Sequence, residues 1–219
     1  MPEVLALADS EPLYYEEVPG KSRDAPLLVL LHGRGADEND LPPLVDYVAR
    51  GWNAVSIRAP LEFEGGGYAW YHFLQRGGPD ERTLGASIKA LEATIKDIRE
   101  GYPASPTVYL GFSQGALMAL VMATLRLDGL VGAAALSGYM PKDELLPAPV
   151  ARLKGLPVFQ THAPNDFLLP FAWAEDTRDR LVKARADLTW VEHSSGHTIP
   201  LDSMERLATW LARCGQAPR

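Results

Sequence analysis

The stretch from Pro106 to Met122 constrains the fold of this chain more than any other. After a proline, which is excluded from the middle of a sheet, it begins with the β-favouring residues Thr107–Tyr109. It ends with Ala, Leu and Met, which favour helix. Between the two lies Gly111-Phe112-Ser113-Gln114-Gly115, a G-x-S-x-G motif. The stretch therefore predicts a strand that turns directly into a helix, with a serine at the turn.

The spacing of the motif has a steric reason. A strand that reverses straight into a helix forces the serine into a strained backbone conformation, and Gly111 and Gly115 let the strand and the helix approach closely. The Ser113 hydroxyl then stands at the tip of the turn, and the peptide N–H of Gln114 points to where an oxyanion would form. Ser113 is therefore the candidate nucleophile.

Length, charge and cysteine content narrow the class of protein. The 219 residues fit one domain, 1–219, and the net charge of −7 without a run of Lys or Arg argues against nucleic acid and against an acidic membrane surface. The first nine residues lack a basic region and a long apolar core, so we expect no signal peptide, and no apolar run has the roughly 18 residues of a spanning helix. One cysteine, Cys214, excludes an internal disulfide. We therefore expect a cytoplasmic protein with no stable membrane insertion.

Short apolar runs alternate with helical patterns along the chain. This alternation predicts an α/β fold with a mostly parallel central sheet and helices on both faces. The segment between Leu136 and Pro157 is too rich in proline to supply a large cap domain, and residues 61–79 read as a long irregular loop. The expected strands are 14–18, 26–31, 52–57, 107–110, 130–136, 157–162 and 188–192. Helices are expected at about 40–50, at 114–125 and at 171–186, and two more are expected to begin after Asp80 and at Pro200.

A serine nucleophile needs a base and an acid that orients the base. In parallel sheets functional groups collect beyond the carboxyl ends of strands, so the partners are sought there and downstream of Ser113. Asp166 follows one such strand and His197 follows the next, which predicts Asp166 as the acid and His197 as the base. The alternatives are His193 as the base and a purely local turn or cap role for Asp166. His162 is expected to pack beside the site, His72 to lie on the loop surface or pocket wall, and Cys214 to be inert.

The second oxyanion donor is expected in the glycine-rich loop after the 26–31 strand. The backbone N–H of Arg34 is the first choice and that of Gly33 the second, with Gln114 as the other donor, while the role of the Arg34 side chain stays open. The apolar part of a substrate is expected against Phe63, Trp70, Leu168 and Leu169. Gly65–Gly67 is not followed by the residues of a phosphate loop, and the histidines lack zinc-type spacing, so neither a cofactor nor a metal is expected.

Taken together, four motifs resemble one known family. They are Leu31-His32-Gly33-x-Gly35, Gly111-Phe112-Ser113-Gln114-Gly115, His162-x-Pro164-x-Asp166-x-x-x-Pro170 and Gly196-His197-x-Ile199. In this order and spacing, from about Leu27 to Trp210, they resemble the phospholipase/carboxylesterase family of small, lidless α/β-hydrolases. The resemblance implies the same roles for Ser113, Asp166 and His197, and an oxyanion hole made by the backbone of Arg34 and Gln114.

The residues and the resemblance lead to one expected activity. It is hydrolysis of carboxylic esters, or of thioesters, with small or medium acyl chains through an acyl-enzyme. Two alternatives stay open: a ligand-binding protein without activity on a hydrolase fold, and a lysophospholipase or acyl-protein thioesterase. The expected partner is a small acyl ester or thioester, and a homodimer formed through an exposed apolar patch is a further expectation.

Overall fold

The computed structural model describes residues 12–74 and 77–216, so the expectation for the first nine residues lies outside the described part. Seven strands form the central sheet: β1 (Tyr15–Val18), β2 (Leu27–Leu31), β3 (Asn53–Ile57), β6 (Thr107–Phe112), β7 (Leu130–Leu136), β8 (Pro157–His162) and β9 (Asp187–Glu192). Their spatial order is β1-β3-β2-β6-β7-β8-β9. Only β1 runs antiparallel to its neighbour, so the prediction of a mostly parallel sheet is confirmed.

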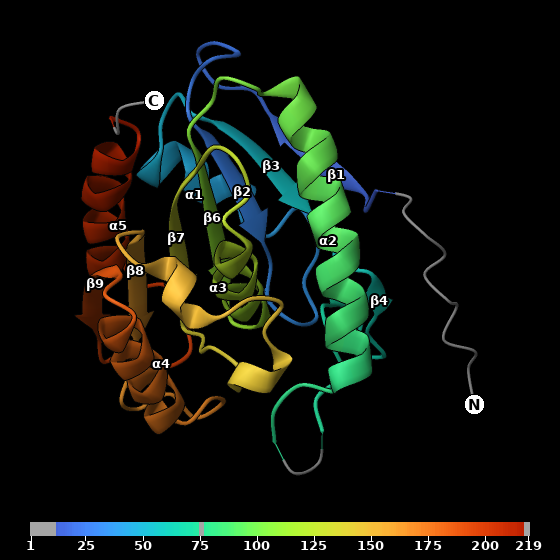
Figure 1. The fold of residues 1–219 in the computed structure, drawn as a ribbon, viewed down its shortest axis with the longest axis vertical. Helices are drawn as coiled ribbons and strands as arrows, with labels where there is room; N and C mark the ends of the chain where they lie inside the picture. Colours follow the sequence, from blue (N-terminus) through green and yellow to red (C-terminus); the bar gives the residue numbers. More distant parts are fainter. Residues whose placement is uncertain (1–11, 75–76, 217–219) are drawn as a thin grey trace.

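Helices cover both faces of this sheet (Figure 1). They are α1 (Pro42–Val48), α2 (Glu81–Gly101), α3 (Gln114–Leu125), α4 (Phe171–Lys183) and α5 (Leu201–Cys214). Alternate side chains of a strand point to opposite faces, and β2 shows this directly. Leu27, Val29 and Leu31 pack in one core with α2, α3 and α4, whereas Leu28 and Leu30 pack in a second core with α1 and α5.

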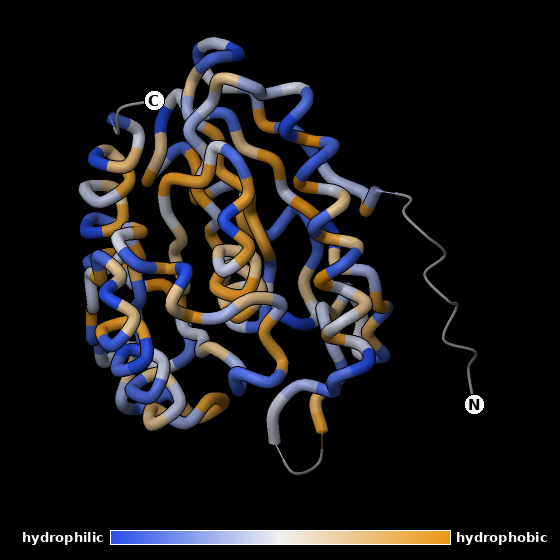
Figure 2. The backbone as a smooth tube through the Cα atoms, viewed as in Figure 1, coloured by the Kyte–Doolittle hydropathy of each residue, from blue (hydrophilic) through white to orange (hydrophobic). Residues whose placement is uncertain are grey.

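The central position of β6 explains why α3 is apolar on every side. Every residue of α3 except Leu125 is buried, because the helix lies between the sheet and α2. In Figure 2 the tube is hydrophobic along the inner strands and α3. Along the outer helices, hydrophobic residues alternate with hydrophilic ones. Among residues 12–74 and 77–216, no helix is both long enough and apolar enough to cross a membrane.

The region expected to be one irregular loop contains a small hairpin. Its strands are β4 (Leu61–Glu62) and β5 (Tyr68–Ala69), which are too short to leave a periodic pattern in the sequence. Gly67 needs to be glycine because its φ is +72° and a Cβ there would lie 2.4 Å from the carbonyl oxygen of Gly35. The hairpin is thereby pressed against the glycine-rich loop that follows β2.

Several element ends differ from the sequence-based expectation. α1 begins at Pro42, two residues later than expected, since proline is favoured in the first turn of a helix. α4 ends at Lys183, shortly before Arg185 adopts a positive φ of 59°. Cys214 is the buried last residue of α5 and does not lie beyond the helix. Between β7 and β8 the described chain forms two short 3-10 helices, η1 (Asp143–Leu145) and η2 (Val150–Leu153), and no large cap domain.

Candidate active site

The turn between β6 and α3 has the geometry that the motif predicts. Ser113 adopts φ 55° and ψ −115°, a strained conformation for a residue other than glycine. A Cβ on Gly111 would lie 2.0 Å from the carbonyl oxygen of Gly115, and a Cβ on Gly115 would lie 1.9 Å from that of Leu31. Glycine at both positions therefore lets α3 start directly against β6 and β2, with Ser113 at the tip.

Ser113, His197 and Asp166 form one hydrogen-bonded chain, although they are far apart in the sequence. The Nε2 atom of His197 lies 2.9 Å from the Ser113 Oγ, and its Nδ1 lies 2.7 Å from the Asp166 Oδ2. The side chains of His197 and Asp166 are 8% and 0% exposed. The ring of Phe112 also packs against the imidazole, with the ring centres 5.1 Å apart.

Asp166 is held as a carboxylate. Its Oδ1 accepts hydrogen bonds from the amides of Leu168 and Leu169 at 2.8 and 3.0 Å, which leaves Oδ2 for His197. Burial by itself raises the pKa of the Asp166 carboxyl, but the bonds from His197 and from the two amides outweigh it and lower this pKa below its ordinary value. An ionised Asp166 fixes the tautomer of His197 that leaves Nε2 facing Ser113.

The loops that carry Asp166 and His197 are tied to each other and to β7. Asn165 donates from Nδ2 to the carbonyl of Ser194 at 2.8 Å and accepts from the amide of Gly196 at 3.3 Å. The Ser137 hydroxyl donates to the carbonyl of Thr198 at 3.1 Å. The sequence gives no signal for these contacts, because they join segments about 30 or more positions apart.

His193, His162 and His72 make no hydrogen bond to Ser113 in the described part of the chain. His193 is buried, its Nδ1 accepts from the Ser195 amide at 3.3 Å, and no contact joins it to Ser113. His162 is buried beside the acid, with its Nε2 3.3 Å from the carbonyl of Leu169 and 3.4 Å from the Asp166 Oδ2. Burial lowers the pKa of both imidazoles. His72 is exposed on the loop after β5.

The loop after β2 lies beside the nucleophile. A Cβ on Gly33 would be 3.5 Å from the Cβ of Ser113. Within the described residues the N–H groups of Arg34 and Gln114 donate to no protein acceptor, and the same is true of Gly33, whereas the Gly35 amide is engaged by the carbonyl of Tyr68 at 2.8 Å. The exposed Arg34 guanidinium lies over the ring of Phe63, 5.2 Å from its centre.

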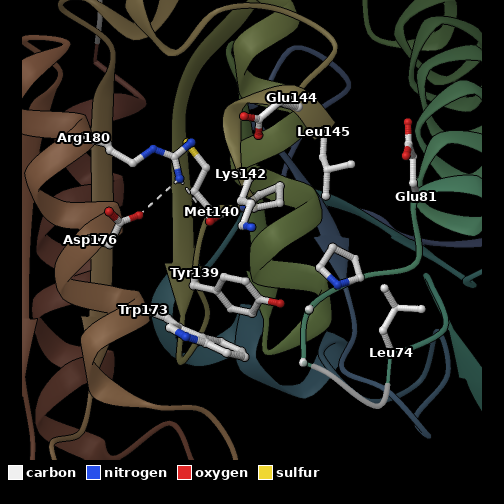
Figure 3. Close-up of a pocket in the computed structure, with 14 residues that line it drawn as sticks. Leu74, Glu81, Tyr139, Met140, Lys142, Glu144, Leu145, Trp173, Asp176 and Arg180 are labelled. Atoms are coloured by element: carbon white, nitrogen blue, oxygen red, sulfur yellow. Dashed lines mark hydrogen bonds and ion pairs between the residues drawn. The ribbon is translucent and has the colours of Figure 1, made fainter.

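A cavity of about 740 Å³ lies among the segment that follows β7, the start of α2 and α4 (Figure 3); Ser113, Asp166 and His197 are not among the residues that line it. Tyr139 and Trp173 form its aromatic wall, with ring centres 4.7 Å apart. Its apolar surface also includes Leu74 and Leu145, and charged side chains such as Lys142 and Arg180 stand at its edge. Tyr139 follows Gly138, whose Cβ position is 2.9 Å from the carbonyl oxygen of Ser113, so the segment that supplies Tyr139 passes the backbone of the candidate nucleophile.

None of the four side chains expected to form the substrate wall lines this cavity. Trp70 is fully buried and presents no surface to a ligand in this structure; its indole N–H donates to the carbonyl of His32 at 2.9 Å, so it supports the loop after β2. Leu169 is buried, while Phe63 and Leu168 are exposed. The sequence analysis did not single out Tyr139 and Trp173, which line this cavity; the position of Tyr139 just after a strand end was the available signal for it.

No group of three or more His, Cys, Asp or Glu side chains in the described residues could hold a metal ion. The arrangement combines the Ser113 hydroxyl, the His197 imidazole and the buried Asp166 carboxylate on the far side of the imidazole. The backbone N–H groups of Arg34 and Gln114, which donate to no acceptor within the described residues, complete it. This is the constellation of nucleophilic acyl transfer.

The sheet order, the helices on both faces and the serine turn define an α/β-hydrolase fold without a large cap domain. Residues 15–215 match the family described as Phospholipase/Carboxylesterase, and the chain belongs to that family of hydrolases.

Relatives cover almost the whole chain. The acyl-protein thioesterase 1 of Yarrowia lipolytica is 25% identical over 213 residues, which are 89% of this chain and 94% of that protein. The Bacillus cereus carboxylesterase structure is 25% identical with a TM-score of 0.79, and covers 92% of this chain and 94% of its own. The structure of esterase PE8 is 28% identical with a TM-score of 0.81, and the match covers 93% of this chain and 100% of that one.

Proposed function

We propose that Ser113, His197 and Asp166 are the catalytic triad of a carboxylic ester hydrolase. The observation that carries the proposal is the pair of contacts that place the His197 imidazole between the Ser113 hydroxyl and the Asp166 carboxylate, at 2.9 and 2.7 Å. The membership of the chain in a hydrolase family supports the same chemistry. With the Nδ1 proton of His197 directed at Asp166, Nε2 is left to accept the proton of Ser113.

The reaction follows from these positions. His197 takes the proton of Ser113 while the serine oxygen attacks the ester carbonyl, and the N–H groups of Arg34 and Gln114 receive the negative oxygen of the tetrahedral intermediate. The intermediate collapses to an acyl-enzyme as His197 protonates the leaving alcohol. His197 then activates a water that attacks the acyl-enzyme, and the acid leaves with Ser113 restored. Asp166 stays ionised and stabilises the imidazolium in both steps.

We propose that the apolar part of the ester, of small or medium size, occupies the cavity walled by Tyr139 and Trp173. Cavities of about 300–1,000 Å³ with apolar walls and a few polar groups suit small ligands, and this one has about 740 Å³. Thioester cleavage by the same residues is the second candidate, favoured by the similarity to the thioesterase of Yarrowia lipolytica.

The test is covalent labelling followed by turnover. Wild type, Ser113→Ala and His197→Ala are treated with a fluorophosphonate, and intact mass and peptide mapping locate the adduct. p-Nitrophenyl esters with acyl chains from acetyl to dodecanoyl, and the matching acyl-coenzyme A thioesters, are then assayed. One adduct at Ser113 and ester hydrolysis only in wild type support the proposal. A wild type that neither labels nor turns over contradicts it and favours a ligand-binding protein without activity.

We also propose a homodimer and a cytoplasmic location. The exposed apolar side chains of Phe167 and Leu168, which are 83% and 57% exposed, support the first, because contiguous exposed apolar surface marks association sites. The single cysteine supports the second. Analytical ultracentrifugation of wild type and Phe167→Ser tests the dimer: a monomer at all concentrations contradicts it. Fractionation of cells that express the chain tests the location.

A further inference from the structure

The side chain of Gln114 joins two segments that are far apart in the sequence. It is 5% exposed, and both ends of its amide are engaged by the loop after β5. Its Oε1 accepts from the backbone N–H of Trp70 at 3.0 Å, and its Nε2 donates to the carbonyl of Tyr71 at 3.0 Å. The residue that offers one free amide next to Ser113 therefore also holds this aromatic loop.

Trp70 passes this restraint on to the loop after β2. Its indole N–H donates to the carbonyl of His32 at 2.9 Å, and its own carbonyl accepts from the hydroxyl of Ser87 on α2. The backbone and side chain of Trp70 are thus fixed by three partners in a fully buried position. An indole held in this way acts as a rigid spacer between Gln114 and His32.

His32 then fixes one peptide plane of that loop. It is fully buried, its Nδ1 lies 2.7 Å from the carbonyl oxygen of Gly33, and its Nε2 accepts from the amide of Ala59 at 3.0 Å. Burial lowers the pKa of this imidazole, and the neutral tautomer with the proton on Nδ1 satisfies both contacts. Because a peptide unit is planar and trans, fixing the Gly33 carbonyl also fixes the direction of the Arg34 N–H, which belongs to the same unit.

We propose that the side chains of Gln114, Trp70 and His32 are positioning residues for the oxyanion hole. Together they hold the Arg34 N–H at a set direction and distance from the amide of Gln114, so that both donors meet the same oxygen. The proposal rests on the proposed function, because it concerns the hole that such a reaction needs. It assigns to Gln114 a side-chain role in addition to that of its backbone amide.

The test replaces the Gln114 amide while keeping its backbone N–H. Gln114→Met has a side chain of similar length that cannot make either hydrogen bond. The matched control is Gln160→Met in β8, since Gln160 is also fully buried and donates to a backbone carbonyl, that of Ala174 at 3.0 Å, but does not contact the loop after β2. Gln114→Met loses two buried hydrogen bonds and Gln160→Met loses one, so the melting temperature of each variant is measured beside its kcat to separate a loss of stability from a loss of oxyanion binding.

We expect Gln114→Met to lower kcat for p-nitrophenyl butyrate by about 10- to 100-fold, because a misplacement of about 1 Å can cost as much as 10²-fold. The KM should change less than about threefold, since the ground-state carbonyl is uncharged. The inhibition constant of a trifluoromethyl ketone, which forms a tetrahedral oxyanion on the serine, should rise by the same factor as kcat/KM falls. Gln160→Met should keep kcat and this inhibition constant, whatever its melting temperature.

Two results overturn the proposal: a kcat of Gln114→Met within about threefold of wild type, or an equal fall in Gln160→Met. If Gln114→Met does not fold, Trp70→Phe removes the bond to the His32 carbonyl together with part of the buried ring volume while keeping an aromatic ring, and the same selective loss of ketone binding is required of it. Failure of the triad itself looks different, because wild type would then show neither fluorophosphonate labelling nor ester hydrolysis.

Discussion

Replacement of Gly115 by alanine tests how closely the fold has to be packed for the site to exist. A Cβ at this position would lie 1.9 Å from the carbonyl oxygen of Leu31 and 2.6 Å from that of His32. Both are backbone atoms of β2 or of its continuation, so no side-chain rotation relieves the clash. To reach even 3.0 Å from the Leu31 oxygen, α3 and β2 have to separate by about 1.1 Å.

This displacement moves Ser113 and Gln114, at the start of α3, away from the loop that carries Arg34. Because a misplacement of about 1 Å costs about 10²-fold in rate, we expect kcat to fall about 100-fold. Overpacking of a buried contact costs about 1–3 kcal/mol, so the free energy of unfolding should fall by that amount. Initial rates with p-nitrophenyl butyrate and urea unfolding followed by tryptophan fluorescence measure the two effects.

Gly85→Ala is the matched control. Gly85 lies within α2, and an added Cβ would meet nothing within 4 Å. In a helix interior this change stabilises by about 0.5–1 kcal/mol, and kcat should stay at the wild-type value. The packing argument is refuted if Gly115→Ala keeps kcat within about threefold and the unfolding free energy within about 0.5 kcal/mol of wild type.

Three further predictions follow from the burial and contacts of single side chains. Asp166→Asn removes the charge that holds the His197 tautomer, so kcat should fall about 10⁴-fold in ester assays, and a fall below tenfold contradicts the role of the acid. The free energy of unfolding should decrease as the pH falls below about 6.5. Burial lowers the pKa of His32, His162 and His193, so the unfolded chain binds more protons than the folded one. Urea titrations across this pH range test the prediction, and an unfolding free energy that does not change with pH counts against it. Burial raises the pKa of the Cys214 thiol to about 12, so a disulfide reagent should leave the native protein unmodified at about pH 8 and react with one thiol per chain after unfolding.

Much of the fold could be predicted because local signals and burial agree. The five residues of β2 form one apolar run, and all five are buried between two layers of helices. α3 occupies the predicted residues 114–125; its residues 115–123 are apolar, so no face of the helix favours contact with water. β4 and β5 were missed since two-residue strands have no period, and they depend on contacts with the loop after β2.

The candidate site could also be predicted in part from the sequence. Ser113 is recognisable because its turn requires glycine on both sides within five residues. Asp166 and His197 were selected as residues that follow strand ends, and the structure brings them to Ser113, while His193 lies outside the chain of contacts. For Trp70 the sequence shows that the residue is apolar but not whether it faces a cavity or the core, and the structure buries it.

The sequence by itself determined the order of the seven sheet strands and the five α-helices, the serine turn and the identity of the three residues that meet there. These depend on short-range sterics and on the rule that parallel strands end at one edge of a sheet. Only the tertiary structure decided that Gln114 and Trp70 hold the loop of Arg34, and that Tyr139 and Trp173 wall the cavity. Their roles come from contacts between segments separated by more than 30 positions, and such contacts leave no periodic pattern in a single chain.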